Sequence, residues 1–237
     1  MPTAYLLVSH GSHDPRPEIA MQKLASLLGE KLQNQVGTAY LELQPEPLHA
    51  QIVEFSKKFL VASSPEPICI KILPLFLLPG VHVMEDIPAE VAQAQQILGE
   101  NALIELKPYL GSNAGLVNLL AHLKATVAAQ KYILLAHGSS RPGFQKAMDK
   151  LVANLDVVTA YWAVPPSLDS QVAQLVADGY REIAIIPYFL FAGGITDAIA
   201  GATEKLQLQF PGVCFQLTQP LGANPELVDL IWDLLHE

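Results

Sequence analysis

LLVSHGS at residues 6–12 returns as LLAHGS at residues 134–139, and this repeated stretch decides the fold. In each copy an apolar run ends in a histidine that is followed by glycine and a hydroxyl residue. An unbroken apolar run is typical of a parallel strand that is buried on both faces. Each copy therefore predicts a buried strand that presents one imidazole, His10 or His137, at its carboxyl end, where open α/β sheets bind their ligands.

The segments around the two copies repeat the same order of strands and helices. Strands are expected at residues 5–9, 38–43, 68–78 and 102–110, then at 132–136, 157–164, 182–191 and 214–221. Helices are expected at residues 17–29, 48–59, 87–98 and 113–128, then at 144–153, 168–177, 196–208 and 225–235. Residues 79–86 are expected to form a loop. This alternation predicts right-handed crossovers and a mainly parallel sheet in each half.

Three pairs of short stretches also match between the halves, in the same order. AYLE at residues 39–42 matches AYWA at 160–163, PLFL at 74–77 matches PYFL at 187–190, and LGSN at 110–113 matches LGAN at 221–224. The chain is therefore predicted to be an internal duplication of the α/β class. We expect two similar three-layer domains, residues 1–128 and 129–237, each with a mainly four-stranded parallel sheet flanked by helices. The ligand is expected in the cleft between them.

The composition excludes several classes of protein. Hydrophobic residues make up 51% of the chain and charged residues 16%, which is far from the signature of disorder. A net charge of −9 without a basic run argues against binding of nucleic acid. The first residues lack the charged region of a signal peptide, and no apolar run is long enough to span a membrane, so a cytoplasmic protein is expected. Cys69 and Cys214 are expected to be buried free thiols, and they are too few for a cysteine metal knuckle.

His10, His82 and Glu42 are the candidate metal ligands. His10 and His82 each follow a predicted strand of the first half and Glu42 lies near the end of another, so the three side chains can meet at one edge of the sheet. Neutral imidazoles suit iron, cobalt, nickel and zinc, and a carboxylate completes a two-histidine, one-carboxylate face with open positions. The alternatives are that the histidines only cap their strand ends through hydrogen bonds and that Glu42 is a solvated charge.

A comparison of the two halves favours the metal site. The counterpart of Glu42 is Ala163 and that of His82 is Ile195, so only His137 is kept in the second half. Groups that the fold itself required would be needed in both copies. A single reactive site requires only one set, and we expect it in the first half.

Arginine is rare and its positions are repeated. Arg16-Pro17 and Arg141-Pro142 occupy equivalent loops, where guanidinium groups and helix N-termini suit carboxylate or phosphate ligands. The alternative is that each arginine forms an ordinary surface ion pair.

Together these motifs resemble the class II tetrapyrrole chelatases, and among them the two-domain sirohydrochlorin chelatases. The resemblance covers nearly the whole chain. It is carried by SHGS at residues 9–12 with DPR at 14–16, by YLE at 40–42, by PLFL at 74–77 with GVH at 80–82, and by AHGSSRP at 136–142.

This resemblance implies insertion of a divalent metal into sirohydrochlorin without nucleotide hydrolysis, with His10 and His82 handling the metal. Glu42 is expected to assist them as a third catalytic residue. Ser12, Arg16, His137 and Arg141 are expected to bind the substrate and its carboxylates. No prosthetic group is expected, because the metal is a substrate. A monomer is expected, with a dimer as the open alternative.

Two features of the family bear on which metal is inserted. Some cobalt-associated members carry a histidine-rich segment and a C-terminal cysteine motif, and this sequence has neither. Iron is therefore favoured over cobalt or nickel, with cobalt insertion for cobalamin synthesis as the alternative. Two further readings stay open, a metal carrier without catalysis and an α/β module that binds nucleotide or phosphate. No GxGxxG or Walker A pattern supports the latter.

Overall fold

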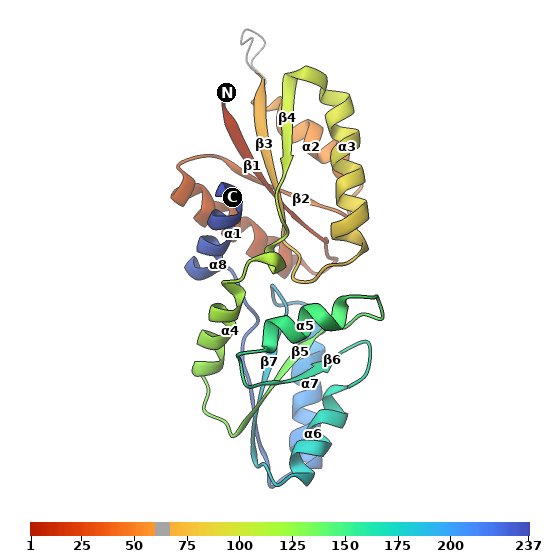
Figure 1. Cartoon of the computed structure of the whole chain (residues 1–237), viewed down its shortest axis with the longest axis vertical. Coiled ribbons are helices and arrows are strands. Elements are labelled where there is room, and N and C mark those ends of the chain that lie inside the picture. The colour runs from red at the N-terminus through yellow and green to blue at the C-terminus, as the bar shows by residue number, and fades with distance from the viewer. Residues whose placement is uncertain (60–66) are drawn as a thin grey trace. The chain divides into compact units, whose positions relative to one another are not determined.

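The computed structural model describes residues 1–59 and 67–237, and backbone contacts divide these residues into two compact units (Figure 1). The first unit comprises residues 1–113 together with 223–237, and the second comprises residues 114–222.

The first unit is a four-stranded parallel sheet with the order β2-β1-β3-β4. Its strands are β1 (Thr3–Ser9), β2 (Val36–Tyr40), β3 (Ile68–Pro74) and β4 (Ala102–Leu106). Its helices are α1 (Pro15–Leu32), α2 (Leu48–Lys57), α3 (Ile87–Leu98) and α8 (Pro225–His236), with short turns η1 (His82–Asp86), η2 (Gly99–Asn101) and η3 (Leu110–Ser112). Helices α1 and α8 pack together beside the sheet, and α2 packs with α3 (Figure 1).

The second unit repeats this architecture with the order β6-β5-β7-β8, again all parallel. Its strands are β5 (Lys131–Ala136), β6 (Val158–Tyr161), β7 (Glu182–Pro187) and β8 (Cys214–Leu217). Its helices are α4 (Leu116–Ala125), α5 (Phe144–Val152), α6 (Leu168–Ala177) and α7 (Gly194–Gln209). The prediction of two four-stranded parallel α/β sheets is thus confirmed.

The central strands are buried because helices cover both of their faces. In β1, Leu6 and Val8 join the cluster that includes Ile52 of α2 and Ile87 of α3. Leu7, on the opposite face of the strand, is also fully buried. This two-sided burial explains why the strand reads as a continuous apolar run, and it aims the residue after the strand at the open carboxyl edge of the sheet.

The last helix of each half does not stay with the unit that its sequence position suggests. We predicted a boundary between residues 128 and 129, but α4 groups with the second unit and α8 with the first. Lys31 of α1 forms an ion pair with Asp229 of α8 and lies 5.3 Å from the ring of Trp232. Lys71 of β3 donates a 2.9 Å hydrogen bond to the carbonyl of Leu235. Helix α8, from the end of the chain, therefore packs with α1 against the first sheet.

A glutamine from a neighbouring helix bonds the backbone at each of the two edge strands of both sheets. Gln51 of α2 accepts from the N–H and donates to the carbonyl of Tyr40 on β2, and Gln171 of α6 donates to β6. Gln95 of α3 and Gln207 of α7 bond the backbones of β4 and β8 in the same way. Unpaired edge groups invite pairing with another chain, so these amides protect all four edges.

Several predicted boundaries differ from the observed ones. The strands expected to reach residues 78, 110, 164 and 191 end at Pro74, Leu106, Tyr161 and Pro187, because the chain leaves the sheet to form the loops of the carboxyl edge. Residues 82–86, expected as loop, form a π-helical turn. Cys69 is buried as predicted, but Cys214 is exposed, because it begins the edge strand β8. Among the helices of residues 1–59 and 67–237, none has the length and apolarity that a membrane crossing requires.

Candidate metal site

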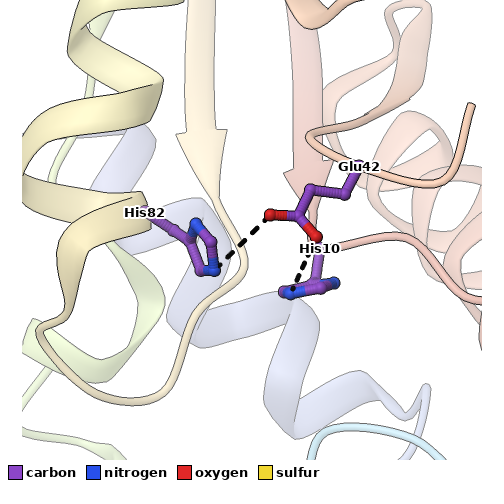
Figure 2. Close-up of side chains that lie close together, drawn as sticks. All are labelled: His10, Glu42 and His82. Atoms are coloured by element: carbon purple, nitrogen blue, oxygen red, sulfur yellow. Dashed lines mark ion pairs between the residues drawn. The ribbon is translucent and has the colours of Figure 1, made fainter.

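Three strand ends of the first unit bring His10, Glu42 and His82 together (Figure 2). His10 directly follows β1, Glu42 lies two residues beyond β2, and His82 begins η1 after β3. In the order β2-β1-β3-β4 the chain adds β2 on one side of β1 and then β3 and β4 on the other, so the strand order reverses between β1 and β3. Loops on either side of such a point diverge and leave a crevice. The predicted convergence of the three residues is confirmed.

Hydrogen bonds between the loops hold the backbone at this edge. The N–H of Leu41 donates to the carbonyl of Ser9 at 2.9 Å, and the N–H of Glu42 donates to the carbonyl of His10 at 2.8 Å. The pairing of β1 with β2 thus continues for two residues beyond the strands. These bonds fix the backbone of Glu42 relative to that of His10.

The side chains point toward one another. Glu42 Oε2 lies 3.7 Å from His10 Nε2, and Glu42 Oε1 lies 3.9 Å from His82 Nε2, so each carboxylate oxygen faces one imidazole (Figure 2). The two imidazole rings are 5.0 Å apart at 86°. These separations are too long for direct hydrogen bonds.

The arrangement suits a divalent transition metal. The three ligand atoms lie within 4.8 Å of one another, and atoms that share one ion at about 2.1 Å lie at most about 4.2 Å apart, so a small side-chain movement closes the set. The side chains of His10, Glu42 and His82 are 49%, 47% and 34% exposed, which leaves coordination positions open toward solvent. Within residues 1–59 and 67–237 this is the one group of three such ligands.

Gly11 keeps the loop after β1 in the position that this geometry requires. Its φ of +99° belongs to the left-handed region, and a Cβ there would lie 2.1 Å from the backbone oxygen of Glu42. We expect Gly11→Ala to push Glu42 away from the histidines and to weaken Co²⁺ binding roughly 10–100-fold, the effect of disturbing the support of a ligand. Titration with Co²⁺, followed by its visible absorption, measures this.

Gly138→Ala is the matched control, because Gly138 occupies the same loop of the second unit at φ +88°. It strains an equivalent turn without touching the three ligands, so Co²⁺ affinity should be retained. Equal losses in both variants would contradict the role given to Gly11.

His82 has two further neighbours that the sequence reasoning missed. Its Nδ1 lies 2.8 Å from Asp86 Oδ2, and its ring lies 6.1 Å from the ring of Phe76. The spacing of four residues between His82 and Asp86 was the available signal, because such pairs face each other on a helix. It went unused because these residues were expected to form a loop.

The predicted substrate residues of the first unit make local contacts. Arg16 Nε donates to both carboxylate oxygens of Asp14 at 3.0 and 3.1 Å. These side-chain bonds, with the backbone bond from Arg16, lower the pKa of Asp14 to about 2. Ser12 Oγ accepts the N–H of Asp14 at 3.0 Å. The pairing matches the alternative stated for the arginines, and the substrate roles of Ser12 and Arg16 stay predictions.

The second unit repeats the backbone of the site with only one of the three candidate ligands, His137. The N–H of Ala163 donates to the carbonyl of His137 at 2.8 Å, as Glu42 does to His10, and Trp162 bonds Ala136 as Leu41 bonds Ser9. His137 is exposed, and Nδ1 approaches its neighbour's carbonyl at 3.1 Å. The equivalence of Ala163 to Glu42 is therefore seen in the backbone. The substrate roles of His137 and Arg141 stay predictions.

Comparison with known proteins gives consistent matches along the chain. A family model described as CbiX matches residues 4–125 and 131–237. Sirohydrochlorin ferrochelatase of Bacillus subtilis (strain 168) is 24% identical over 249 residues, covering 100% of this chain and 92% of that protein. Sirohydrochlorin cobaltochelatase of Priestia megaterium is 24% identical over 255 residues, covering 98% of this chain and 78% of that protein. The solved structure of SirB from Bacillus subtilis with Fe3+ has the same fold, with a TM-score of 0.77 at 24% identity and coverage of 100% and 95%.

Proposed function

The chain belongs to the CbiX family, and from this membership we propose that it inserts a divalent metal ion into sirohydrochlorin, without nucleotide hydrolysis. The observation that carries the proposal is the cluster of His10, Glu42 and His82. It supplies two imidazoles and one carboxylate, which bind borderline metals, and an imidazole released from a metal can act as a base.

Metal insertion makes two demands on a protein. The ion must be held with only part of its hydration shell, and the two pyrrole N–H protons that the ion replaces must be accepted. His10, His82 and Glu42 can hold the ion from one side while their open side faces the macrocycle. As the side chains release the ion to the ring nitrogens, the freed lone pairs of two of them accept the two pyrrole protons.

The surroundings suit a planar macrocycle that carries carboxylates. Leu43 follows Glu42 and is 46% exposed, and Met84 lies two residues after His82 and is 64% exposed. We propose that these two exposed apolar side chains contact the faces of the macrocycle, since ligand sites combine apolar surface with a few polar groups. The substrate carboxylates are proposed to bind Arg16, Arg141, Ser12 and His137, with Arg16 exchanging its bond to Asp14 for the ligand.

Ferrous iron is the proposed metal, with cobalt as the second candidate. Both metals accept imidazole and carboxylate ligands, and the relatives include enzymes named for each. A monomer in the cytoplasm completes the proposal, and the free thiols of Cys69 and Cys214 agree with a reducing compartment.

An anaerobic insertion assay tests this function. Purified protein is mixed with sirohydrochlorin and Fe²⁺, Co²⁺ or Ni²⁺ in turn, and the absorbance change of the macrocycle is compared with the spontaneous rate. We expect acceleration, greatest with Fe²⁺. Stoichiometric metal binding without acceleration would indicate a carrier, and tight nucleotide binding without response to sirohydrochlorin would indicate a different α/β module.

A further inference from the structure

Asp86 lies behind His82, on the side of the imidazole away from Glu42. Its Oδ2 is 2.8 Å from Nδ1, while the other ring nitrogen, Nε2, is the one that faces Glu42. The two side chains are 34% and 42% exposed, so the pair is held in a partly open position and not by burial in the core.

A carboxylate can only accept a hydrogen bond from Nδ1, so the proton of a neutral His82 must sit there. Nε2 then carries the free lone pair, and this is the nitrogen nearest the other two ligands. Resting on the proposed function, we propose that Asp86 is a positioning residue that holds His82 in the tautomer and orientation needed to take the metal through Nε2. Partners of this kind orient histidine ligands and increase their basicity.

His10 has no comparable support among the contacts described. Its Nδ1 approaches the carbonyl of Gly11 at 3.4 Å, which exceeds the usual length of such a bond. Asp86 therefore makes the two histidines unequal. His82 is the oriented ligand, and His10 is the one freer to turn as the ion leaves for the ring.

The backbone around the pair supports this assignment. Pro74 and Pro187 end β3 and β7, and the following helices each bury an isoleucine fully, Ile87 at the start of α3 and Ile199 in the second turn of α7. One residue more separates Pro74 from Ile87 than separates Pro187 from Ile199.

The first unit accommodates this extra residue as the π-helical turn η1, in which the N–H of Ile87 bonds the carbonyl of His82. Such turns are frequent at functional sites. The second unit, which has no counterpart of the His82 imidazole, continues directly into the α-helix α7. His82 and Asp86 are the first and last residues of this turn. The extra residue therefore lies in the same segment as the His82–Asp86 pair.

Three variants of the full chain test the proposal: Asp86→Ala, Asp86→Asn and Glu85→Ala. Asp86→Ala removes the acceptor, and Co²⁺ binding should weaken roughly 10–100-fold. Asp86→Asn keeps an oxygen that can accept from Nδ1, so it should recover most of that loss. Glu85→Ala removes an equal charge from the adjacent, exposed position and should leave binding unchanged.

The tautomer of His82 in the metal-free protein gives a second readout, through proton–nitrogen correlation spectra of the imidazoles. We expect the proton on Nδ1 in the unsubstituted protein and a mixture of tautomers in Asp86→Ala. Unchanged Co²⁺ affinity in Asp86→Ala, or a proton on Nε2 in the unsubstituted protein, would overturn the proposal. Neither measurement uses sirohydrochlorin, so a protein that passes both and inserts no metal would refute the chelatase function alone.

Discussion

Replacing His10 by alanine is expected to reduce the rate of metal insertion about 10²–10⁴-fold, the usual range for loss of a positioned acid–base group. His10 supplies one of the three ligand atoms and is the imidazole with the weaker orienting contact, so its removal leaves Glu42 and His82 to hold the ion. The initial rate with sirohydrochlorin and Fe²⁺ measures the loss, and a Co²⁺ titration shows how much of it arises from metal binding.

His122→Ala is the matched control for this experiment. His122 is an exposed histidine of α4, outside the ligand cluster, and its loss should leave the rate unchanged. The fold should survive in both variants, because the His10 side chain is 49% exposed and packs in neither core cluster. A folded and fully active His10→Ala protein would contradict the assignment of His10, Glu42 and His82 as the metal site.

The second large effect concerns the exchange of final helices between the units. Ile231 of α8 is fully buried, and its replacement by alanine should cost about 2–5 kcal/mol in the free energy of unfolding. Because α8 packs on α1 and β3, the loss should appear as faster hydrogen exchange in β1 and β3, although residue 231 belongs to the second half of the sequence. Amide exchange resolved by peptide measures this.

The reciprocal variant is Leu120→Ala. Leu120 of α4 is 1% exposed and belongs to the first half of the sequence, yet its loss should accelerate exchange in β5 and β7. Asp233→Ala, at an exposed position of α8, controls for changes in helix propensity. If Ile231→Ala loosened β5–β8 and spared β1–β4, the grouping of α8 with the first unit would be wrong.

The fold and the candidate ligands were largely predictable from the sequence. A buried parallel strand needs apolar residues on both faces, so β1 and β5 can be recognised in the sequence as continuous apolar runs. Alternation with helices then makes the strands parallel, and parallel strands end at one edge. That rule is enough to bring His10, Glu42 and His82 together without any knowledge of the loops.

Two features depended on contacts that a sequence pattern does not contain. The buried faces of α4 and α8 show that each helix packs on something, but not on which of two similar sheets, and proximity in the sequence favoured the wrong partner for both. The turn at His82–Asp86 was hidden because one extra residue breaks the helical period where the helix begins.

The sequence by itself thus determined the class of fold, the duplication and which three side chains make up the candidate metal site. Only the tertiary structure decided which helix completes each unit and which carboxylate, that of Asp86, lies against Nδ1 of His82. The physical reason is that strand burial and chain direction are local properties that repeat along a sequence. The choice of a packing partner depends on energies of contact between distant segments, and those arise only when the chain is folded.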